Sequence, residues 1–539
     1  MSVDSTQPTL WVDVEDLVHY LANHRRPSGI QRVTFEICQA LTELDGGSGS
    51  VRFLRRGTGP CDMLSVDWNS LYKSYTHIAN ASDRPAINSG IISSRRTVPG
   101  SQKVQAATDG KRREKALGLL ASTLKMQAVA IVTLAWLPVR VVTFAGRIAA
   151  RHLTSGLSGR WMARAGVGGR RHVGSMENLF VGRSLREAAR PGDVFIVLGS
   201  PWMYQDYVQT VRMVRDDLRM RFALLIYDMI PARRPEWCNQ GVITTFANWH
   251  RSVLPLADQI FSISRATADD VTGWAHETGV ALLDIVQPIP MGTGLTEQHS
   301  SEDSERDHLP SAGSYVLFVS TIEARKNHEL LFRVWRRLLT DLPSSQVPTL
   351  IFAGRVGWLV VDLLQQLENS NWLNGKIRLL RDPTDSDLSA LYRGCRFTVF
   401  PSLFEGWGLP VSESLAMGKP AIISDRTSLP EAGGNLARYF DPENVDDAYL
   451  AIRAVIEDPV DLQKWCDRVA ADFQKIPWTA AATVIRQTLN TAKPKILVEE
   501  MAFLQQRQAV GTVASTRGQT PGDDTNLLCA KRPDLDRRA

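Results

Sequence analysis

The sequence predicts an α/β protein built from two Rossmann-like domains that face a cleft. Short apolar runs alternate with longer amphipathic stretches, which is typical of parallel strands joined by helices that cover both faces of a sheet. This alternation occurs twice, on either side of a polar stretch, and 539 residues are enough for two such domains. Ligands of such sheets bind at the carboxyl ends of the strands, so we expect a ligand in the cleft.

Residues 1–295 are assigned to the N-terminal domain. An apolar run at 10–14 predicts its first strand. After Gly29, the positions of Ile30, Val33 and Ile37 place these residues on one face of a helix. Later apolar runs of the buried-strand type lie at 194–198, 222–227 and 259–264.

Residues 95–172 form a basic, amphipathic and partly apolar insertion in this domain. They carry fifteen lysines and arginines against Asp109 and Glu114, a net charge of +13 within a chain of +5, so the remainder carries −8. Their most apolar run, 126–139, is shorter than the roughly 18–20 residues that a membrane-spanning helix needs. We expect the insertion to bind an anionic membrane surface; the alternative is a disordered or loosely packed insertion.

A polar linker, 296–314, separates this domain from a C-terminal nucleotide-sugar-binding domain at 315–498. Turn-forming and charged residues make 499–539 a predicted disordered tail. The apolar runs that predict the strands of the C-terminal domain are 315–319, 349–353, 376–380, 397–400 and 421–424.

The composition excludes several classes of protein. A net charge of +5 argues against a whole-chain nucleic-acid binder, which would be far more basic. The first ten residues lack the basic and apolar regions of a signal peptide. We therefore expect a cytoplasmic protein. The cysteines have neither zinc-site nor thioredoxin spacing and predict no disulfide framework: Cys38, Cys61, Cys238, Cys395, Cys466 and Cys529.

The segment 397–424 carries the clearest functional pattern. A strand ends near Phe400, a loop with Gly406 and Gly408 follows, and Pro410 suits the first turn of a helix. Backbone N–H groups at a helix N-terminus have no partner within the helix and lie at the positive end of the helix dipole. The loop therefore predicts an anion site suited to a diphosphate.

Two carboxylates, Glu405 and Glu413, lie in this segment. Glu405 stands between a strand end and glycines whose backbone must approach a neighbour closely. Beside a diphosphate, hydrogen bonding to sugar hydroxyls is the natural use of such groups. Glu413 has the alternative role of capping its own helix. A glycosidase pair is the competing interpretation, but its carboxylates must flank a glycosidic bond, and the sequence gives no sign of that geometry.

The spacing of Glu405 and Glu413 within PSLFEGWGLPVSESLAMG resembles the signature of the family 4 glycosyltransferases, which are retaining enzymes of the GT-B fold. The resemblance is closest to the bacterial mannosyltransferase branch that builds surface polysaccharides. It is nearly continuous in the C-terminal half, through 319–331, 353–364, 385–402 and 428–444. It is thinner in the N-terminal half, at 28–33, 225–237, 262–267 and 289–292.

The resemblance implies three catalytic residues, Glu405, Lys326 and Arg325. Lys326 matches the lysine that grips the donor diphosphate, Arg325 supports it, and Glu405 contacts the donor sugar. The alternative for the Lys-Arg pair is a solvated face. Many relatives carry Gly-Arg where this chain has Ser320-Thr321, so Arg325 is the substitute for the missing arginine.

The resemblance also implies a set of donor-binding residues, in which Glu413 contacts the ribose hydroxyls and the loop amides hold phosphate. Many relatives have a histidine where this chain has Tyr227, which leaves Asp228 as the polar group at that strand end. As a lone carboxylate it has the alternative role of a turn cap. The implied donor-binding set is Gly29, Asp228, Gly406, Trp407, Gly408, Leu409 and Glu413.

The predicted activity is transfer of a hexose, with retention, from a nucleotide-diphosphate sugar to a lipid-linked glycan at the inner face of the cytoplasmic membrane. GDP-mannose is the first expectation for the donor and a UDP-hexose the second. No cofactor and no metal is expected, because Asp385 and Asp387 look like helix caps. Two alternatives remain: a GT-B sugar-nucleotide epimerase, and a non-catalytic membrane-associated scaffold.

Overall fold

The computed structural model describes most of both predicted domains. Both sheets belong to one compact unit of the chain. The insertion 95–172, the tail 499–539 and linker residues 296–308 lie outside the described residues. Within the part that is described, no helix combines the length and the apolar character needed to cross a membrane. The described residues are 7–23, 29–57, 59, 61–80, 180–204, 206–294 and 309–491.

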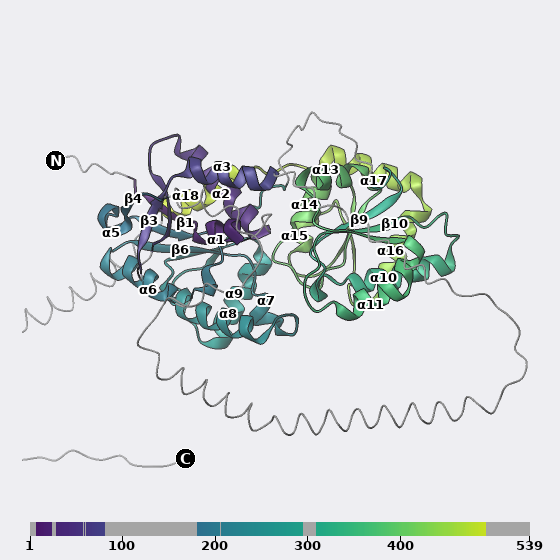
Figure 1. Cartoon of the computed structure of the whole chain (residues 1–539), viewed down its shortest axis with the longest axis horizontal. Coiled ribbons are helices and arrows are strands. Elements are labelled where there is room, and N and C mark those ends of the chain that lie inside the picture. Colours follow the sequence, from purple (N-terminus) through teal and green to yellow (C-terminus); the bar gives the residue numbers. More distant parts are fainter. Residues whose placement is uncertain are drawn as a thin grey trace, which may run out of the picture. The chain divides into compact units, whose positions relative to one another are not determined.

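The first sheet has eight strands, and β1 lies in its middle (Figure 1). β1 pairs in parallel with β2 on one side and β5 on the other. In sheet order the strands are β4 (Phe180–Ser184), β3 (Met63–Val66), β2 (Val51–Arg56), β1 (Leu10–Asp13), β5 (Val194–Val197), β6 (Arg221–Ile226), β7 (Gln259–Ser262) and β8 (Val286–Pro288).

The apolar runs predicted four parallel strands of this sheet and missed β8 at one edge and three strands at the other. β1, β5, β6 and β7 coincide with the runs, since every residue of these strands is buried. The three strands missed at the other edge are β2, β3 and β4, in which β3 pairs antiparallel with both neighbours. Only Phe53 and Leu54 of β2 are buried, and three of its other residues are arginines. Its sequence therefore lacks the apolar run of an internal strand.

The second sheet has six strands, all parallel. Its order corresponds to the 3-2-1-4-5-6 order of a Rossmann sheet, so the chain reverses its direction of growth between β9 and β12. In sheet order the strands are β11 (Ile377–Leu380), β10 (Thr349–Ala353), β9 (Tyr315–Val319), β12 (Thr398–Phe400), β13 (Ala421–Ser424) and β14 (Arg438–Phe440).

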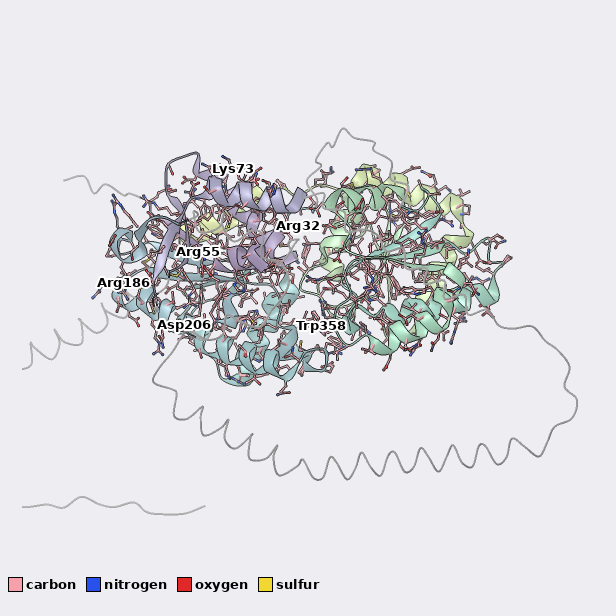
Figure 2. All side chains as sticks on the ribbon, viewed as in Figure 1. Arg32, Arg55, Lys73, Arg186, Asp206 and Trp358 are labelled. Atoms are coloured by element: carbon pink, nitrogen blue, oxygen red, sulfur yellow. The ribbon has the colours of Figure 1, made fainter. Side chains whose placement is uncertain are left out.

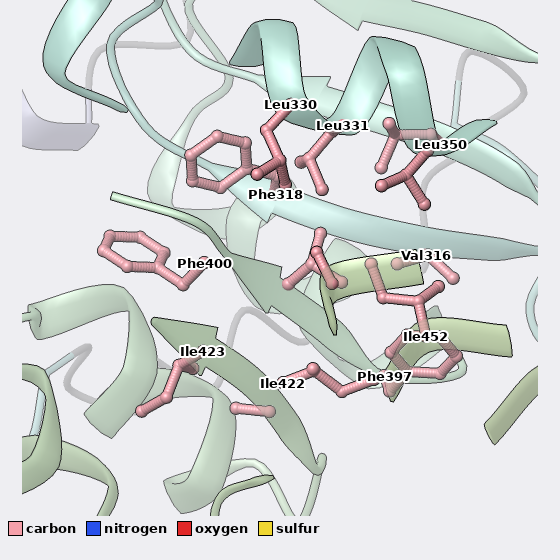
Figure 3. Close-up of a cluster of buried hydrophobic side chains, with 14 of the residues drawn as sticks. Val316, Phe318, Leu330, Leu331, Leu350, Phe397, Phe400, Ile422, Ile423 and Ile452 are labelled. Carbon is pink, nitrogen blue, oxygen red and sulfur yellow. The ribbon is translucent and has the colours of Figure 1, made fainter. Parts of the chain in front are cut away.

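The core of the second domain lies between this sheet and its helices (Figure 3). Leu330 and Leu331 from helix α10 belong to the same buried cluster as Val316 and Phe318 of β9. Phe318 meets Phe400 of β12 edge to face, with ring centroids 5.3 Å apart. These contacts fix the two strands whose ends carry the candidate site.

The helices connect the strands as the alternating pattern predicted. Those of the N-terminal half are α1 (Glu15–Asn23), α2 (Gly29–Asp45), α3 (Trp68–Asn80), α5 (Leu185–Ala188), α6 (Tyr207–Arg212), α7 (Ile230–Arg233), α8 (Gln240–Val253) and α9 (Arg265–Thr278). Those of the C-terminal half are α10 (His328–Asp341), α11 (Val361–Asn369), α12 (Asn371–Gly375), α13 (Asp385–Gly394), α14 (Leu409–Ala416), α15 (Leu429–Gly433), α16 (Val445–Glu457), α17 (Pro459–Asp472) and α18 (Trp478–Thr491).

The last helix, α18, packs with the first domain although it follows the second in sequence. Its buried face, which includes Ile485 and Leu489, belongs to the same apolar cluster as β1 and α2. Arg221 at the start of β6 donates a hydrogen bond to the carbonyl of Leu489, at 2.6 Å. The predicted C-terminal domain, 315–498, was therefore wrong for residues 478–491, because the apolar face of this helix completes the first core.

Candidate active site

The candidate site lies at the carboxyl ends of β9 and β12, the neighbouring strands between which the strand order of the second sheet changes direction. β9 and β12 are neighbours, and the segments that leave their carboxyl ends are the 3₁₀ turn η6 (Ala324–Lys326) and the loop 401–408. The backbone N–H of Leu403 donates to the carbonyl of Arg325, at 2.9 Å, and joins the two segments. The topology thus brings together residues that lie about eighty positions apart in the sequence.

Glu405 is held by two cations from η6. Its Oε1 accepts from Nζ of Lys326 at 2.5 Å, and its Oε2 accepts from Arg325 at 2.7 Å. The carboxylate is almost wholly buried, with 8% of the residue exposed. The three residues that the resemblance implies to be catalytic therefore form one ion-pair cluster, and their catalytic roles stay a prediction.

The two cations keep Glu405 ionised in spite of its burial. Burial alone would raise the pKa of this carboxyl group, but Arg325 and Lys326 outweigh it and lower the pKa from 4.5 to about 2. For Lys326 the balance is reversed, because burial and the neighbouring Arg325 lower the pKa of its ammonium group. A negative oxygen placed beside Lys326 would therefore stabilise its charged form.

We expect the protein to lose stability in acid through this cluster. The pKa of Glu405 is lower in the folded state, so its contribution to stability is complete above its unfolded pKa of about 4.5 and is lost as the pH falls towards 2. The shift corresponds to about 3 kcal/mol. Urea unfolding at pH 7, 4 and 3 measures it. A Glu405→Gln variant should lose less stability over this range than the unmodified chain, and equal losses would contradict the assignment.

Arg325 organises the loop as well as pairing with Glu405. Its guanidinium donates to the carbonyl of Phe404 at 2.7 Å and to Glu323 at 2.6 Å. Glu323 is 3% exposed, and the sequence prediction missed it because nothing in the pattern distinguishes it from a surface glutamate. Arg325 therefore positions the loop, whereas Lys326 bonds the Glu405 carboxylate with an ammonium group that has three N–H donors.

The loop leads into the N-terminus of α14. Gly408 precedes the helix with φ 132°, a conformation that side chains with a Cβ rarely adopt, and Pro410 lies in the first turn. The hydroxyl of Ser428 donates to the carbonyls of Glu405 and Trp407, at 2.9 and 2.7 Å. The loop is thus fixed from both sides, as the predicted diphosphate site at this helix N-terminus requires.

Gly406 lies close to the backbone of the first domain. A Cβ on this residue would lie 2.0 Å from the backbone carbonyl oxygen of Tyr227, which directly follows β6. Thr267 donates to the carbonyls of both Tyr227 and Gly406, each at 3.3 Å. The site therefore includes backbone from the first domain, and position 406 accepts only glycine without a shift.

Asp228 follows Tyr227 and is partly buried near the cluster. Its Oδ1 accepts from the N–H of Ile230 at 3.0 Å, which is the turn-capping role considered from the sequence. Burial raises the pKa of Asp228, while the charges of Arg325 and Lys326 oppose that rise. Asp228 thus caps a turn and also contributes to the electrostatics of the Glu405 cluster.

The remaining loop residues contact the first domain. Leu409 and Trp407 pack against its apolar cluster, and Trp407 Nε1 donates to Ser412 at 3.2 Å. Gly29 begins α2, and a Cβ on it would lie 3.9 Å from the side chain of Leu409. The N-termini of α2 and α14 are therefore close to each other.

Glu413 lies in the second turn of α14 rather than the first, and its carboxylate contacts side chains instead of capping the helix. Oε2 accepts from the hydroxyl of Tyr392 at 2.8 Å, and Oε1 accepts from Arg32 at 3.1 Å. The residue is 3% exposed. The sequence missed both partners, because Tyr392 and Arg32 lie in segments with no visible link to Glu413.

Asp385 and Asp387, which were not expected to bind a metal, have hydrogen-bond or ion-pair partners within the protein. Asp387 forms a capping box with Thr384 at the start of α13, as the sequence predicted. The cap prediction was wrong for Asp385, because Thr384 caps this helix and the Asp385 carboxylate pairs with Arg32. Over the described ranges, no three His, Cys, Asp or Glu side chains are grouped in a way that would hold a metal ion.

Comparison with known proteins finds similarity mainly in the C-terminal half of the chain. Residues 300–471 match the family described as "Glycosyl transferases group 1". The chain is 29% identical over 244 residues to the serotype-specific mannosyltransferase WbdA of Escherichia coli, which covers 42% of the chain and 29% of the relative. It is 34% identical over 183 residues to the O-antigen chain mannosyltransferase B of Escherichia coli, which covers 33% of the chain and 45% of the relative. The chain thus spans less than half the length of these relatives.

Among solved structures, a glycosyltransferase from Rickettsia africae is similar over 90% of this chain and 100% of that one, with 12% sequence identity and a TM-score of 0.47.

Proposed function

We propose that this chain transfers a hexose from a nucleotide-diphosphate sugar to a glycan acceptor, with retention at the anomeric carbon. The match of residues 300–471 to the group 1 glycosyl transferases supports this proposal. One observation carries the proposal most directly. Glu405 is held ionised by Lys326 and Arg325 at adjoining strand ends, beside the N-terminus of α14. A buried carboxylate for the sugar and cationic groups for a diphosphate are what this reaction needs.

In the proposed reaction the acceptor hydroxyl attacks the anomeric carbon from the face on which the diphosphate leaves. The new bond joins the acceptor oxygen to the anomeric carbon, the bond to the phosphate oxygen breaks, and the acceptor proton passes to the leaving phosphate. Negative charge that develops on the phosphate is stabilised by Lys326 and by the N-terminus of α14. These groups supply the positive charge without a metal ion or another cofactor.

The other site residues have roles in donor binding. Glu405 hydrogen-bonds the transferred sugar, and Glu413 contacts the ribose hydroxyls of the nucleotide. The loop amides at Gly406, Trp407 and Gly408 lie where the helix dipole favours an anion. Arg325 fixes the loop that carries Glu405, through Phe404 and Glu323.

We propose mannose as the sugar and GDP-mannose as the donor, with a UDP-hexose as the second candidate. The names of two relatives, both mannosyltransferases, support mannose. The proposed acceptor is a lipid-linked glycan of bacterial surface polysaccharide, reached at the inner face of the cytoplasmic membrane. The O-antigen in the name of one relative and the +13 charge of residues 95–172 favour this acceptor.

A thermal-shift screen across nucleotide sugars tests the donor. A bound donor raises the apparent melting temperature by mass action, and at a hundred times its Kd the stabilisation is about 2.7 kcal/mol. GDP-mannose should raise the melting temperature more than GDP alone, UDP-glucose or UDP-N-acetylglucosamine. A larger shift with a UDP-sugar would move the donor assignment to the second candidate.

The donor that gives the largest shift is then incubated with and without acceptor glycan. We expect an acceptor-dependent product whose anomeric configuration equals that of the donor, measured by NMR. Conversion of the donor sugar without acceptor would indicate an epimerase and contradict the proposal. The Glu-x7-Glu segment and the mannosyltransferase relatives favour transfer over epimerisation.

A further inference from the structure

Glu413 depends on the other domain for its orientation. Arg32 lies on α2 (Figure 2), in the first domain. Its guanidinium donates through one nitrogen to Glu413 at 3.1 Å and through the other to Asp385 at 2.7 Å. One planar fork thus joins two carboxylates from α14 and α13, a geometry that lysine cannot reproduce.

The pair is mostly screened from water. The side chain of Arg32 is 15% exposed and that of Glu413 is 3% exposed, whereas that of Asp385 is 45% exposed. Burial raises the pKa of Glu413, and Arg32 and the Tyr392 hydroxyl oppose the rise. A buried carboxylate that lost Arg32 would therefore bind protons more readily and would keep only one of its two side-chain partners.

The surroundings of Glu413 leave its carboxylate little freedom. Tyr392, which is fully buried, fixes Oε2, and Arg32 fixes Oε1. A Cβ on Gly294, in the segment that leaves the first domain, would lie 2.3 Å from Cγ of Glu413. Each carboxylate oxygen has two lone pairs, so both can still accept a hydrogen bond from a ligand hydroxyl.

We infer that Arg32 is a positioning residue for the donor site: it keeps Glu413 oriented towards the ribose hydroxyls, so that the first domain completes the nucleotide pocket of the second. The inference rests on the proposed function, in which Glu413 contacts the ribose. It adds a residue that touches neither sugar nor phosphate and acts through Glu413. Donor recognition therefore depends on contact between the two domains.

The test measures whether Arg32 affects ribose recognition specifically. The variants are Arg32→Met, Arg32→Lys and, as a matched control, Arg333→Met. Arg333 also pairs with a glutamate, Glu329, but its side chain is 55% exposed and lies outside the site. Transfer is measured with GDP-mannose and with its 2′-deoxyribose analogue, and the melting temperature of each variant is recorded.

We expect the unmodified chain to have a KM for the deoxy donor roughly ten to a hundred times higher than for GDP-mannose, which is the loss typical of one hydrogen bond to a charged group. Arg32→Met should raise the KM for GDP-mannose by a similar factor and reduce the ratio between the two donors to near one. Arg32→Lys should restore part of this ratio, and Arg333→Met should leave it unchanged.

Two results would overturn the inference. One is a ratio in Arg32→Met equal to that of the unmodified chain, whether or not kcat falls, since a merely structural arginine would give it. The other is an Arg32→Lys variant that is folded, by its melting temperature, and retains the full ratio. Failure of the proposed function is distinguishable from both, because the unmodified chain would then transfer no sugar from any nucleotide donor.

Discussion

Replacing Glu405 with glutamine is expected to lower kcat for sugar transfer on the order of a hundredfold to a thousandfold. Glutamine keeps the size of the side chain but removes the negative charge that pairs with Lys326 and Arg325. In the proposed reaction this charge also faces the transferred sugar. The measurement is initial rate with saturating acceptor, alongside a thermal melt that reports whether the variant is folded.

Glu329→Gln is the matched control for this variant. Glu329 is also paired with an arginine, but at 46% side-chain exposure and on the outer surface of α10, so its loss should leave the rate unchanged. A Glu405→Gln variant that is folded and transfers sugar at the rate of the control would contradict a catalytic role for Glu405. It would also favour the scaffold alternative, which needs no intact carboxylate.

Replacing Gly406 with alanine is expected to cost about a hundredfold in kcat/KM, for a purely steric reason. The added Cβ would lie 2.0 Å from the carbonyl oxygen of Tyr227 and 3.2 Å from Cβ of Asp228. Either the loop or the end of β6 must move, and a displacement of about 1 Å in a site of this kind costs about a hundredfold. Steady-state kinetics with donor and acceptor varied separately measures the loss.

Gly241→Ala provides the control for a methyl group added elsewhere. Gly241 lies in the first turn of α8, and its added Cβ would meet only Asn239 Oδ1, at 3.4 Å. We expect unchanged kinetics and equal or slightly higher stability, because alanine favours helix over glycine. If Gly406→Ala behaved like this control, the close approach to Tyr227 would have no functional importance.

The sequence predicted the elements that are buried on both faces. Runs such as 315–319 and 421–424 became β9 and β13 because internal parallel strands are apolar throughout. The antiparallel edge was missed, since β2 is half-exposed and carries three arginines. The assignment of α18 also failed, because an amphipathic helix shows that it has an apolar face but not which sheet that face covers.

The residues of the candidate site also fall into two groups, those that the sequence pointed to and those that it did not. Glu405 and Gly406 could be singled out because a strand end followed by glycines and a proline predicts a ligand-binding loop, whereas Lys326 was assigned only through the family resemblance. The partners that set their chemistry were not predictable. Arg32 meets Glu413 across 381 positions, and Glu323 has the sequence context of a surface residue. Such pairings depend on the folded topology, which residue spacing alone does not determine.

Because α18 packs with the first domain, it affects how the chain folds during its synthesis on the ribosome. The chain passes between its domains at Thr293 and again at Ile476, and these residues hydrogen-bond to each other at 2.9 and 2.7 Å. The first core is completed only by Ile485 and Leu489, after every strand of the second sheet has been synthesised. The first domain to be synthesised is therefore the last to complete its core. Until α18 is made, the nascent chain exposes an apolar surface to which chaperones can bind.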